Sequence, residues 1–236
     1  MAEMRYRRLG NSGMQVSVVG LGCNNFGRRL DRESSIKVVH AALDCGINLF
    51  DTADVYGSGE SEEYLGAAIK GRRNSVLIAT KFSSGMGPGP NDHGGSRGYI
   101  RRAVEASLDR LGEDYIDLYQ MHGPDEGTPI EETLSALNDL VREGKVRYIG
   151  SSNFAGWQIA DAAWTARVNH WTPFVSAQNQ YSLLDREVER EVIPACEHFG
   201  QGMLPYLPLA SGMLTGKYRR GQPPPSGTRL AGSPSS

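Results

Sequence analysis

The chain has 236 residues, 39% of them apolar, and 25 basic against 27 acidic side chains give a net charge of −2. This composition excludes a disordered polyampholyte and offers no basic surface for nucleic acid. No apolar run approaches the roughly 18–20 residues of a membrane span, and none follows the arginines near the N-terminus, so we expect neither a membrane anchor nor a secretory signal. Cysteines 23, 45 and 196 are widely spaced and cannot all pair, which favours a reducing, cytoplasmic location.

Seven short runs rich in apolar, β-branched and aromatic residues alternate with amphipathic segments. The runs begin near residues 16, 48, 75, 115, 146, 174 and 203, and each interval fits one βα unit. A small hairpin around residues 11–13 is predicted before the first run. The helical patterns stop at glycines, where a left-handed C-cap would let the chain turn into the next strand. These glycines are Gly46, Gly71, Gly112, Gly144 and Gly200.

Polar residues stand at or near the end of six consecutive predicted strands. They are Asp51, Lys81, His122, Ser152 with Asn153, Gln178 and Tyr206. In a barrel such ends converge on one mouth, whereas an open doubly wound sheet concentrates its chemistry at one switch point. We therefore predict an α/β fold, a (β/α)8 TIM barrel with an N-terminal β-hairpin, of which about seven of the eight βα units are present.

The predicted barrel occupies residues 1–218, and residues 219–236 form a tail rich in Pro, Gly and Ser that we expect to be flexible. At about 31 residues per unit, the eighth strand would begin near residue 233. The last unit is not recognisable there, so we expect a chain truncated at its C-terminus.

Four residues form the first candidate site: Asp51, Tyr56, Lys81 and His122. A lysine that ends an apolar strand needs a partner, and Asp51 ends the neighbouring one. One interpretation is a structural ion pair with a Tyr and a His in nearby loops. The other makes Tyr56 a proton donor, with the ammonium of Lys81 moving the pKa of Tyr56 towards working pH.

A second candidate set carries no charge. Ser152, Asn153 and Gln178 could hold a planar carboxamide such as nicotinamide, or could cap loops. Tyr206 could stack on a ring or be a core aromatic residue. Glycines 20, 22 and 27 have the wrong spacing for a dinucleotide fingerprint and favour a tight turn that lets a ligand approach the backbone. The sequence shows no metal-ligand spacing, P-loop or GxSxG motif.

Several segments resemble the aldo-keto reductases, in particular the branch with bacterial reductases and potassium-channel β subunits. They include NLFDTADVYGSGESEEYLGAAI, ATKF, DYIDLYQMHGPD, GKVRYIGSSNF, AQNQYSLLDR and PYLPLASGMLTGKY, and the match runs in order from about residue 4 to 218. The resemblance implies a (β/α)8 barrel that binds NADPH. Its catalytic tetrad falls on Asp51, Tyr56, Lys81 and His122.

The resemblance also implies the cofactor contacts. Ser152, Asn153 and Gln178 would hold the nicotinamide carboxamide, Tyr206 would stack on the ring, and the turn of Gly22, Cys23 and Asn24 would lie near the ribose. A backbone strip would follow the pyrophosphate: Leu207, Pro208, Leu209, Ala210, Ser211, Gly212 and Leu214, then Lys217. The segment that grips the adenosine 2′-phosphate is not found, so NADPH preference over NADH stays open.

The predicted function is NADPH-dependent reduction of an aldehyde or ketone, in which Tyr56 gives the proton and His122 orients the carbonyl oxygen. One alternative is a nucleotide-sensing binding subunit with little turnover, and another is an inactive truncated reductase. The expected partner is a small-molecule carbonyl compound, and homo-oligomerisation stays open. The sequence does not identify the substrate.

Overall fold

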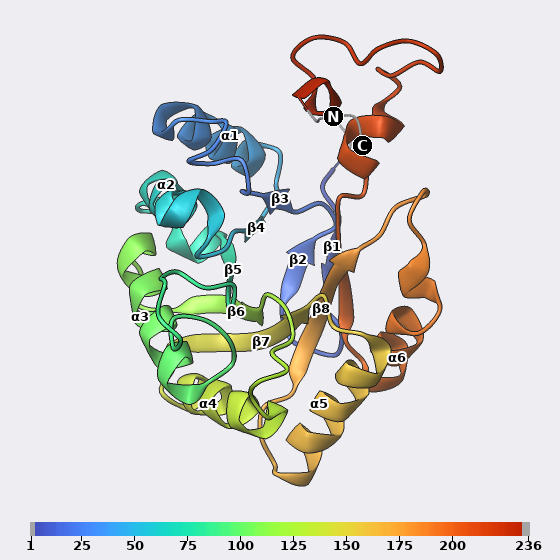
Figure 1. The fold of residues 1–236 in the computed structure, drawn as a ribbon. Helices are drawn as coiled ribbons and strands as arrows, with labels where there is room; N and C mark the ends of the chain where they lie inside the picture. Colours follow the sequence, from blue (N-terminus) through green and yellow to red (C-terminus); the bar gives the residue numbers. More distant parts are fainter. Residues whose placement is uncertain (1–2, 233–236) are drawn as a thin grey trace.

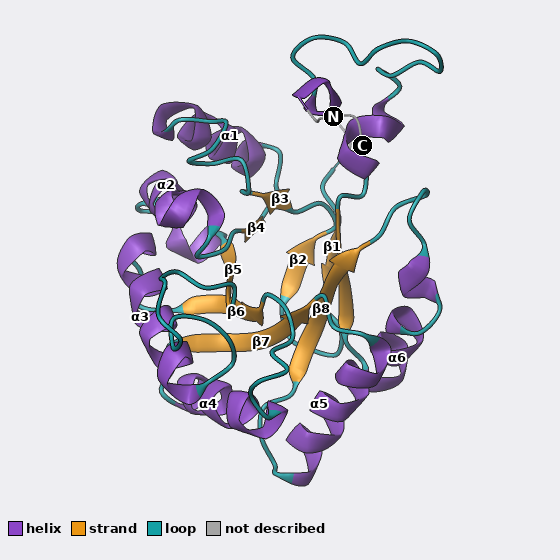
Figure 2. Cartoon of the chain, viewed as in Figure 1, coloured by secondary structure: helices purple, strands orange, loops and turns teal. Residues whose placement is uncertain are grey.

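The computed structural model describes residues 3–232 as one curled parallel sheet with helices along its outer face (Figures 1 and 2). Seven parallel strands lie in the order β3-β4-β5-β6-β7-β8-β9. Their bounds are β3 Leu21–Gly22, β4 Leu49–Asp51, β5 Leu77–Phe82, β6 Ile116–Met121, β7 Val146–Ser152, β8 Phe174–Gln180 and β9 Gly202–Tyr206. Each predicted barrel strand has its counterpart, and the fold is that of the predicted (β/α)8 barrel with seven strands described.

One long helix follows each of the first six barrel strands. These are α1 Arg32–Asp44, α2 Glu60–Ile69, α3 Arg97–Leu111, α4 Ile130–Arg142, α5 Gly156–Val168 and α6 Val192–Phe199. The five glycines predicted to end helical segments all have positive φ, between 67° and 82°. This left-handed conformation carries little strain in glycine, which has no Cβ, and the chain can therefore turn sharply into the next strand.

The N-terminal hairpin closes the end of the barrel opposite the strand ends that carry the candidate site. It consists of β1 Tyr6–Arg8 and β2 Gln15–Ser17, paired antiparallel. Leu9, Met14 and Val16 of this unit are buried in one apolar cluster with Leu49 and Leu118 from the barrel strands. Burial of this surface fixes the hairpin as the floor of the barrel.

The first predicted strand run was wrong in one respect. The segment VSVVGLG was expected to form one barrel strand from Val16, but Val16 and Ser17 belong to the hairpin and only Leu21–Gly22 pairs with β4. The separation has a visible cause: the side chain of Asn48, just before β4, accepts from the Ser17 amide at 2.7 Å and donates to the Gln15 carbonyl at 2.9 Å. The hairpin is thereby attached to the barrel before β3 begins.

A second, larger apolar cluster joins the helices to the sheet. It includes Phe50, Ile78 and Ile149 from the strands and Ile100 and Leu137 from the helices. No helix within residues 3–232 is long and apolar enough to cross a membrane.

The division of the chain into a barrel and a tail at residue 218 stays a prediction. The described part of the tail contains one short 3-10 turn, Arg229–Gly232, and residues 233–236 of the predicted tail lie outside the described residues.

Candidate active site

The centre of the site is an ion pair between neighbouring strands. Asp51 is the last residue of β4, and Lys81 on β5 places its Nζ 2.5 Å from Asp51 Oδ1. The same ammonium donates to the Thr52 carbonyl at 2.8 Å, and the side chain of Lys81 has no exposed surface. A buried ammonium requires such compensation. The predicted partnership of Asp51 and Lys81 is therefore present in the structure.

The second oxygen of Asp51 is held from the opposite side of the barrel. Gln178 on β8 donates to Asp51 Oδ2 at 2.8 Å, and Gln120 on β6 donates to it at 3.1 Å. Side chains from β5, β6 and β8 thus meet at one carboxylate on β4. A carboxylate that accepts several donors has little freedom to rotate. Such convergence of strand ends is what the barrel prediction required.

Tyr56 and His122 lie beside this ion pair. Tyr56 begins the 3-10 turn η1, Tyr56–Gly59, and its ring meets that of His122 edge to face with centroids 5.7 Å apart. Lys81 Nζ lies 5.2 Å from the centroid of the Tyr56 ring. The four predicted tetrad residues are therefore together at the mouth of the barrel.

Burial sets the protonation states of these groups. It raises the pKa of Tyr56, and the opposing charge of Lys81 is the smaller influence. Lys81 lowers the pKa of Tyr56 as expected, but burial outweighs it, so the net displacement is away from working pH. Burial, aided by Lys81, lowers the pKa of His122 to about 4. At neutral pH the site thus contains a protonated phenol and an uncharged imidazole beside an ion pair whose ammonium is buried.

The uncharged candidates form a chain of hydrogen bonds across the mouth. Ser152 Oγ donates to the Gln178 carbonyl at 2.8 Å, and Asn153 Nδ2 donates to the His122 carbonyl at 2.8 Å. The hydroxyl of Tyr206 donates to Asn153 Oδ1 at 2.8 Å. These contacts join the ends of β7, β8 and β9 to the loop after β6. Loop capping and ligand binding are both compatible with this arrangement.

Strained backbone is concentrated at the same end of the barrel. Ser83, Asn153 and Leu207 each follow the last residue of a strand directly and each has positive φ, at 95°, 60° and 52°. Such a conformation is unfavourable for residues that carry a Cβ and is found most often at functional sites. The mouth, rather than the floor, therefore has the backbone signature of a binding site.

The predicted pyrophosphate strip is exposed or half-buried along its whole length. After β9 the chain forms the 3-10 segment η4, Ala210–Thr215, in which Ser211 and Gly212 have φ of 57° and 96°. A Cβ placed on Gly212 would lie 3.1 Å from the Nζ of Lys217. The strip thus combines accessible backbone with a nearby cation, which suits an anionic ligand.

Two glycines border open space at the mouth. A Cβ built on Gly22, the last residue of β3, or on Gly123, next to His122, would meet no atom within 4 Å. His122 Nδ1 is buried and has no hydrogen-bond partner among the described residues. Because a buried polar atom is normally paired, this nitrogen marks a position where a ligand group could bind.

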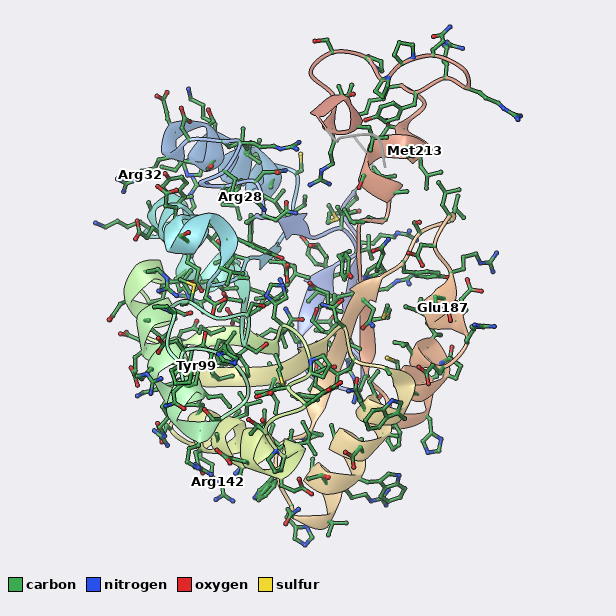
Figure 3. All side chains as sticks on the ribbon, viewed as in Figure 1. Arg28, Arg32, Tyr99, Arg142, Glu187 and Met213 are labelled. Carbon is green, nitrogen blue, oxygen red and sulfur yellow. The ribbon has the colours of Figure 1, made fainter. Side chains whose placement is uncertain are left out.

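The structure differs from the sequence-based expectations at two further places. Cys23 is fully buried: its Sγ lies 3.7 Å from the Leu21 carbonyl, its amide donates to the Asp51 carbonyl at 2.7 Å, and its own carbonyl accepts from Ser61 Oγ at 2.9 Å. Gln120, which holds Asp51, was not predicted, although it is a polar residue in an apolar strand two positions before His122. A hollow of about 640 Å³ lies beside the Tyr56 turn and is lined by Gly27, Arg28, Val55, Gly57, Ser58 and Glu60. Figure 3 labels Arg28 beside α1.

An aspartate, a lysine, a tyrosine and a histidine, the four residues that the resemblance predicted for the site, are thus gathered at the mouth of the barrel. The comparisons with known proteins agree, because a model of the aldo/keto reductase family matches residues 18–233. The chain belongs to the aldo/keto reductase family.

Relatives with this similarity come from bacteria, fungi and plants. The uncharacterized oxidoreductase YrpG of Bacillus subtilis is 43% identical over 97% of this chain and 72% of its own length. A probable voltage-gated potassium channel subunit beta of Arabidopsis thaliana is 42% identical over 97% of this chain and 70% of its own. The versiconal hemiacetal acetate reductase of Aspergillus parasiticus is 41% identical over 89% of this chain and 69% of its own length. The predicted family, with its bacterial and channel-subunit relatives, is thus confirmed, and with it a general role in oxidoreduction.

Proposed function

We propose that this chain reduces aldehydes or ketones to alcohols with NADPH, and that Tyr56 is the proton donor. One observation carries the proposal: a fully buried ammonium, fixed by Asp51, lies 5.2 Å from the ring of a protonated tyrosine at an open barrel mouth. Structural ion pairs need no phenol or imidazole beside them. Acid catalysis of a carbonyl reduction needs a proton donor and a cation that stabilises the resulting phenolate.

The residues at the mouth fit a nicotinamide cofactor. The free space over Gly22 and Gly123 and the exposed backbone after β9 leave room for a ligand, and His122 Nδ1 is a buried polar atom without a partner among the described residues. Ser152, Asn153 and Gln178 would hold the carboxamide, and Tyr206 would contact the ring. The backbone of Gly22, Cys23 and Asn24 would lie near the ribose. Residues 207–214 and Lys217 would lie along the pyrophosphate.

The protein groups then have separate tasks in the reaction. When bound, the nicotinamide supplies the hydride that the carbonyl carbon accepts. The hydroxyl of Tyr56 donates its proton to the carbonyl oxygen, so that hydride and proton together give the alcohol. Lys81 stabilises the phenolate left on Tyr56, and Asp51 holds Lys81 in place. The uncharged imidazole of His122 orients the carbonyl oxygen by a hydrogen bond.

Replacement of Tyr56 by Phe tests the proton donor. We expect the turnover of a panel of aldehydes to fall by at least about a hundredfold, since general acid catalysis contributes about 10²–10⁴. NADPH affinity, followed by the quenching of tryptophan emission, should stay within about twofold because the phenyl ring is retained. Unchanged turnover in Tyr56→Phe would contradict the assignment. Titrations with NADH in parallel measure the cofactor preference.

A second function is a nucleotide-sensing subunit with little turnover. The observation that favours it is the 42% identity to the probable potassium channel subunit beta of Arabidopsis thaliana. The two functions predict different kinetics with the same residues. Steady turnover of aldehydes supports the reductase, whereas NADPH binding followed by at most a single turnover supports the sensor. A chain that binds neither NADPH nor NADH would support the inactive alternative.

A further inference from the structure

The turn that carries Tyr56 contains a buried carboxylate with no role in the proposed reaction. Asp54 is 1% exposed and lies two residues before Tyr56. Its Oδ1 accepts the amide of Val55 at 2.7 Å, and its own amide donates to the Lys81 carbonyl at 3.2 Å. Its Oδ2 is 3.5 Å from the hydroxyl of Tyr99, in the first turn of α3. Figure 3 labels Tyr99 on that helix. Asp54 thus joins the start of the turn to α3.

The other end of the turn contacts the same helix. Gly59 ends η1 with φ of 101°, and a Cβ at this position would lie 2.6 Å from Arg110 Cδ on α3. Arg110 Nε donates to Glu62 Oε2 at 2.7 Å, and Glu62 Oε1 accepts from Thr80 Oγ1 at 2.5 Å. The turn is therefore held between two contacts with α3, and only the one at Asp54 lacks a cation.

The groups around Asp54 leave its charge poorly compensated. Glu62 on α2 is fully buried and already paired with Arg110 of α3. Tyr99 on α3 provides only the long contact, and the hydroxyl of Tyr119 on β6 is buried with no hydrogen-bond partner among the described residues. The ammonium of Lys81 is paired with Asp51 inside the barrel. Burial, followed by the charge of Glu62, raises the pKa of Asp54 to about 7.

Both observed partners of the Asp54 carboxylate are donors, the Val55 amide and the Tyr99 hydroxyl. An ionised carboxylate accepts at both oxygens, and its hydrogen bonds are about twice as strong as those of a neutral group. A protonated carboxyl must instead place its own O–H against an acceptor. Proton uptake at Oδ2 therefore removes the acceptor that faces the Tyr99 hydroxyl, and the contact with α3 must weaken or reverse its direction.

We propose that Asp54 is a positioning residue whose carboxylate holds the Tyr56 turn against α3, so that proton uptake by Asp54 loosens the placement of the Tyr56 phenol. The proposal rests on the proposed function, because it assigns to Tyr56 a position that matters for proton donation. It assigns the control of that position to a residue outside the tetrad.

A spectroscopic titration tests whether Asp54 holds the Tyr56 turn against α3 (the Asp54 clamp), and it requires no activity. In the full chain, the Val55 amide and the Tyr56 ring signals should shift together between pH 6 and 8. Both shifts should vanish in Asp54→Asn, which keeps the shape of the side chain. In Tyr99→Phe the midpoint should move to higher pH, since the ionised carboxylate loses a donor. Asp139→Asn, which removes the partner of Arg97 on the surface between α3 and α4, is the matched control and should titrate like the parent.

The kinetic counterpart is the pH dependence of kcat with saturating NADPH. We expect kcat to rise about fivefold between pH 6 and 8, because a loosened Tyr56 donates less efficiently. In Asp54→Asn, kcat should vary by less than about twofold between pH 6 and 8. Relative to the parent chain, KM for the aldehyde should change less than kcat. If Asp54 had only a structural role, the pH profile of kcat in Asp54→Asn would run parallel to that of the parent chain.

The outcomes separate this proposal from the proposed function. Shifts of Val55 and Tyr56 that persist in Asp54→Asn, or a Tyr56 signal that never follows Val55, would overturn the positioning role. A protein that turns over no aldehyde but shows the linked titration would overturn the proposed function and keep the clamp. Rescue of the parent pH profile by Asp54→Glu would support the carboxylate itself.

Discussion

The two ends of the barrel use the same residue types for opposite purposes. At the floor, a Cβ on Gly202 would lie 2.6 Å from Leu9 Cδ1 and 2.7 Å from the Gly10 amide nitrogen. At the mouth, a Cβ on Gly22 or Gly123 would meet nothing. Glycine at the floor permits close packing of the hairpin, whereas glycine at the mouth keeps space free. The difference shows which end is built for stability and which for a ligand.

Charge divides the two ends in the same way. The floor is an apolar cluster in which Leu9, Met14 and Val16 cover Leu49 and Leu118. The mouth contains an ion pair with a buried ammonium, an imidazole nitrogen without a partner among the described residues, and residues in strained conformations. Groups of this kind reduce stability unless each has its partner, and proteins keep them where they act on a ligand. Variants at each end test whether this division holds.

The largest effect is expected at the mouth, from Lys81→Met. It removes the ammonium and leaves the Asp51 carboxylate without its cation, which should lower the free energy of unfolding by about 3–5 kcal/mol. Urea denaturation measures this loss. Adding Asp51→Asn to the same chain should recover part of the stability, since no uncompensated charge remains. A loss below about 1 kcal/mol in the single variant would mean that the pair is not essential to the fold.

A matched pair of glycine variants compares the ends directly. Gly202→Ala should lower the free energy of unfolding by about 2 kcal/mol, because its Cβ would push on Leu9 and on the backbone of Gly10. Gly22→Ala should change it by less than about 0.5 kcal/mol. The affinity for NADPH should respond in the reverse order, falling about fivefold in Gly22→Ala, whose methyl group enters the proposed cofactor space. Equal losses of stability in Gly202→Ala and Gly22→Ala would refute the distinction between a packed floor and an open mouth.

The pH dependence of stability should also come from the mouth. The pKa of His122 is lowered to about 4 in the folded chain, whereas an unperturbed histidine has a pKa near 6.5. Between these two values the unfolded chain therefore binds a proton that the folded chain does not. The free energy of unfolding should therefore fall as pH drops from about 6.5 to 4, with roughly 2 kcal/mol due to this residue. His122→Gln should remove that part of the slope in denaturation series at several pH values.

The floor provides the control for this measurement. Met14→Ala creates a cavity in an apolar cluster that contains no Asp, Glu or His, so its loss of stability should be the same at pH 4.5 and pH 7. If His122→Gln keeps the slope of the parent chain, other groups cause it and the imidazole is not the buried neutral group described above.

The sequence predicted the fold almost completely because the βα repeat is local. Each apolar run and each helix-ending glycine could be identified from its neighbours, and all five glycines have the predicted left-handed conformation. The error at Val16 arose because strand pairing is not local. Nothing within VSVVGLG shows that Asn48 would attach its first residues to the hairpin.

The candidate site was predictable to the extent that strand ends converge in a barrel. Asp51 and Lys81 could be paired from their positions alone, but Gln120 could not be assigned, because an amide inside a buried strand has no distinct pattern. Asp54 and Glu62 stand in the motif that carries the resemblance, yet their contacts with Tyr99 and Arg110 depend on how α3 packs. The pKa of Tyr56 depends on burial, which spacing along the chain does not give.

The smallest effect is expected from the exposed contact that crosses the mouth. Tyr206→Phe removes only the hydroxyl that donates to Asn153 Oδ1, and it should change the free energy of unfolding by less than about 0.5 kcal/mol. If the ring of Tyr206 contacts the nicotinamide, NADPH affinity in Tyr206→Phe should stay within about threefold, whereas Tyr206→Ala should lose about tenfold through the missing aromatic contact. Fluorescence titration of both variants measures the two affinities. Equal affinities in Phe and Ala would mean that Tyr206 only joins β9 to the loop after β7, and that the ligand surface of the mouth ends at Asn153.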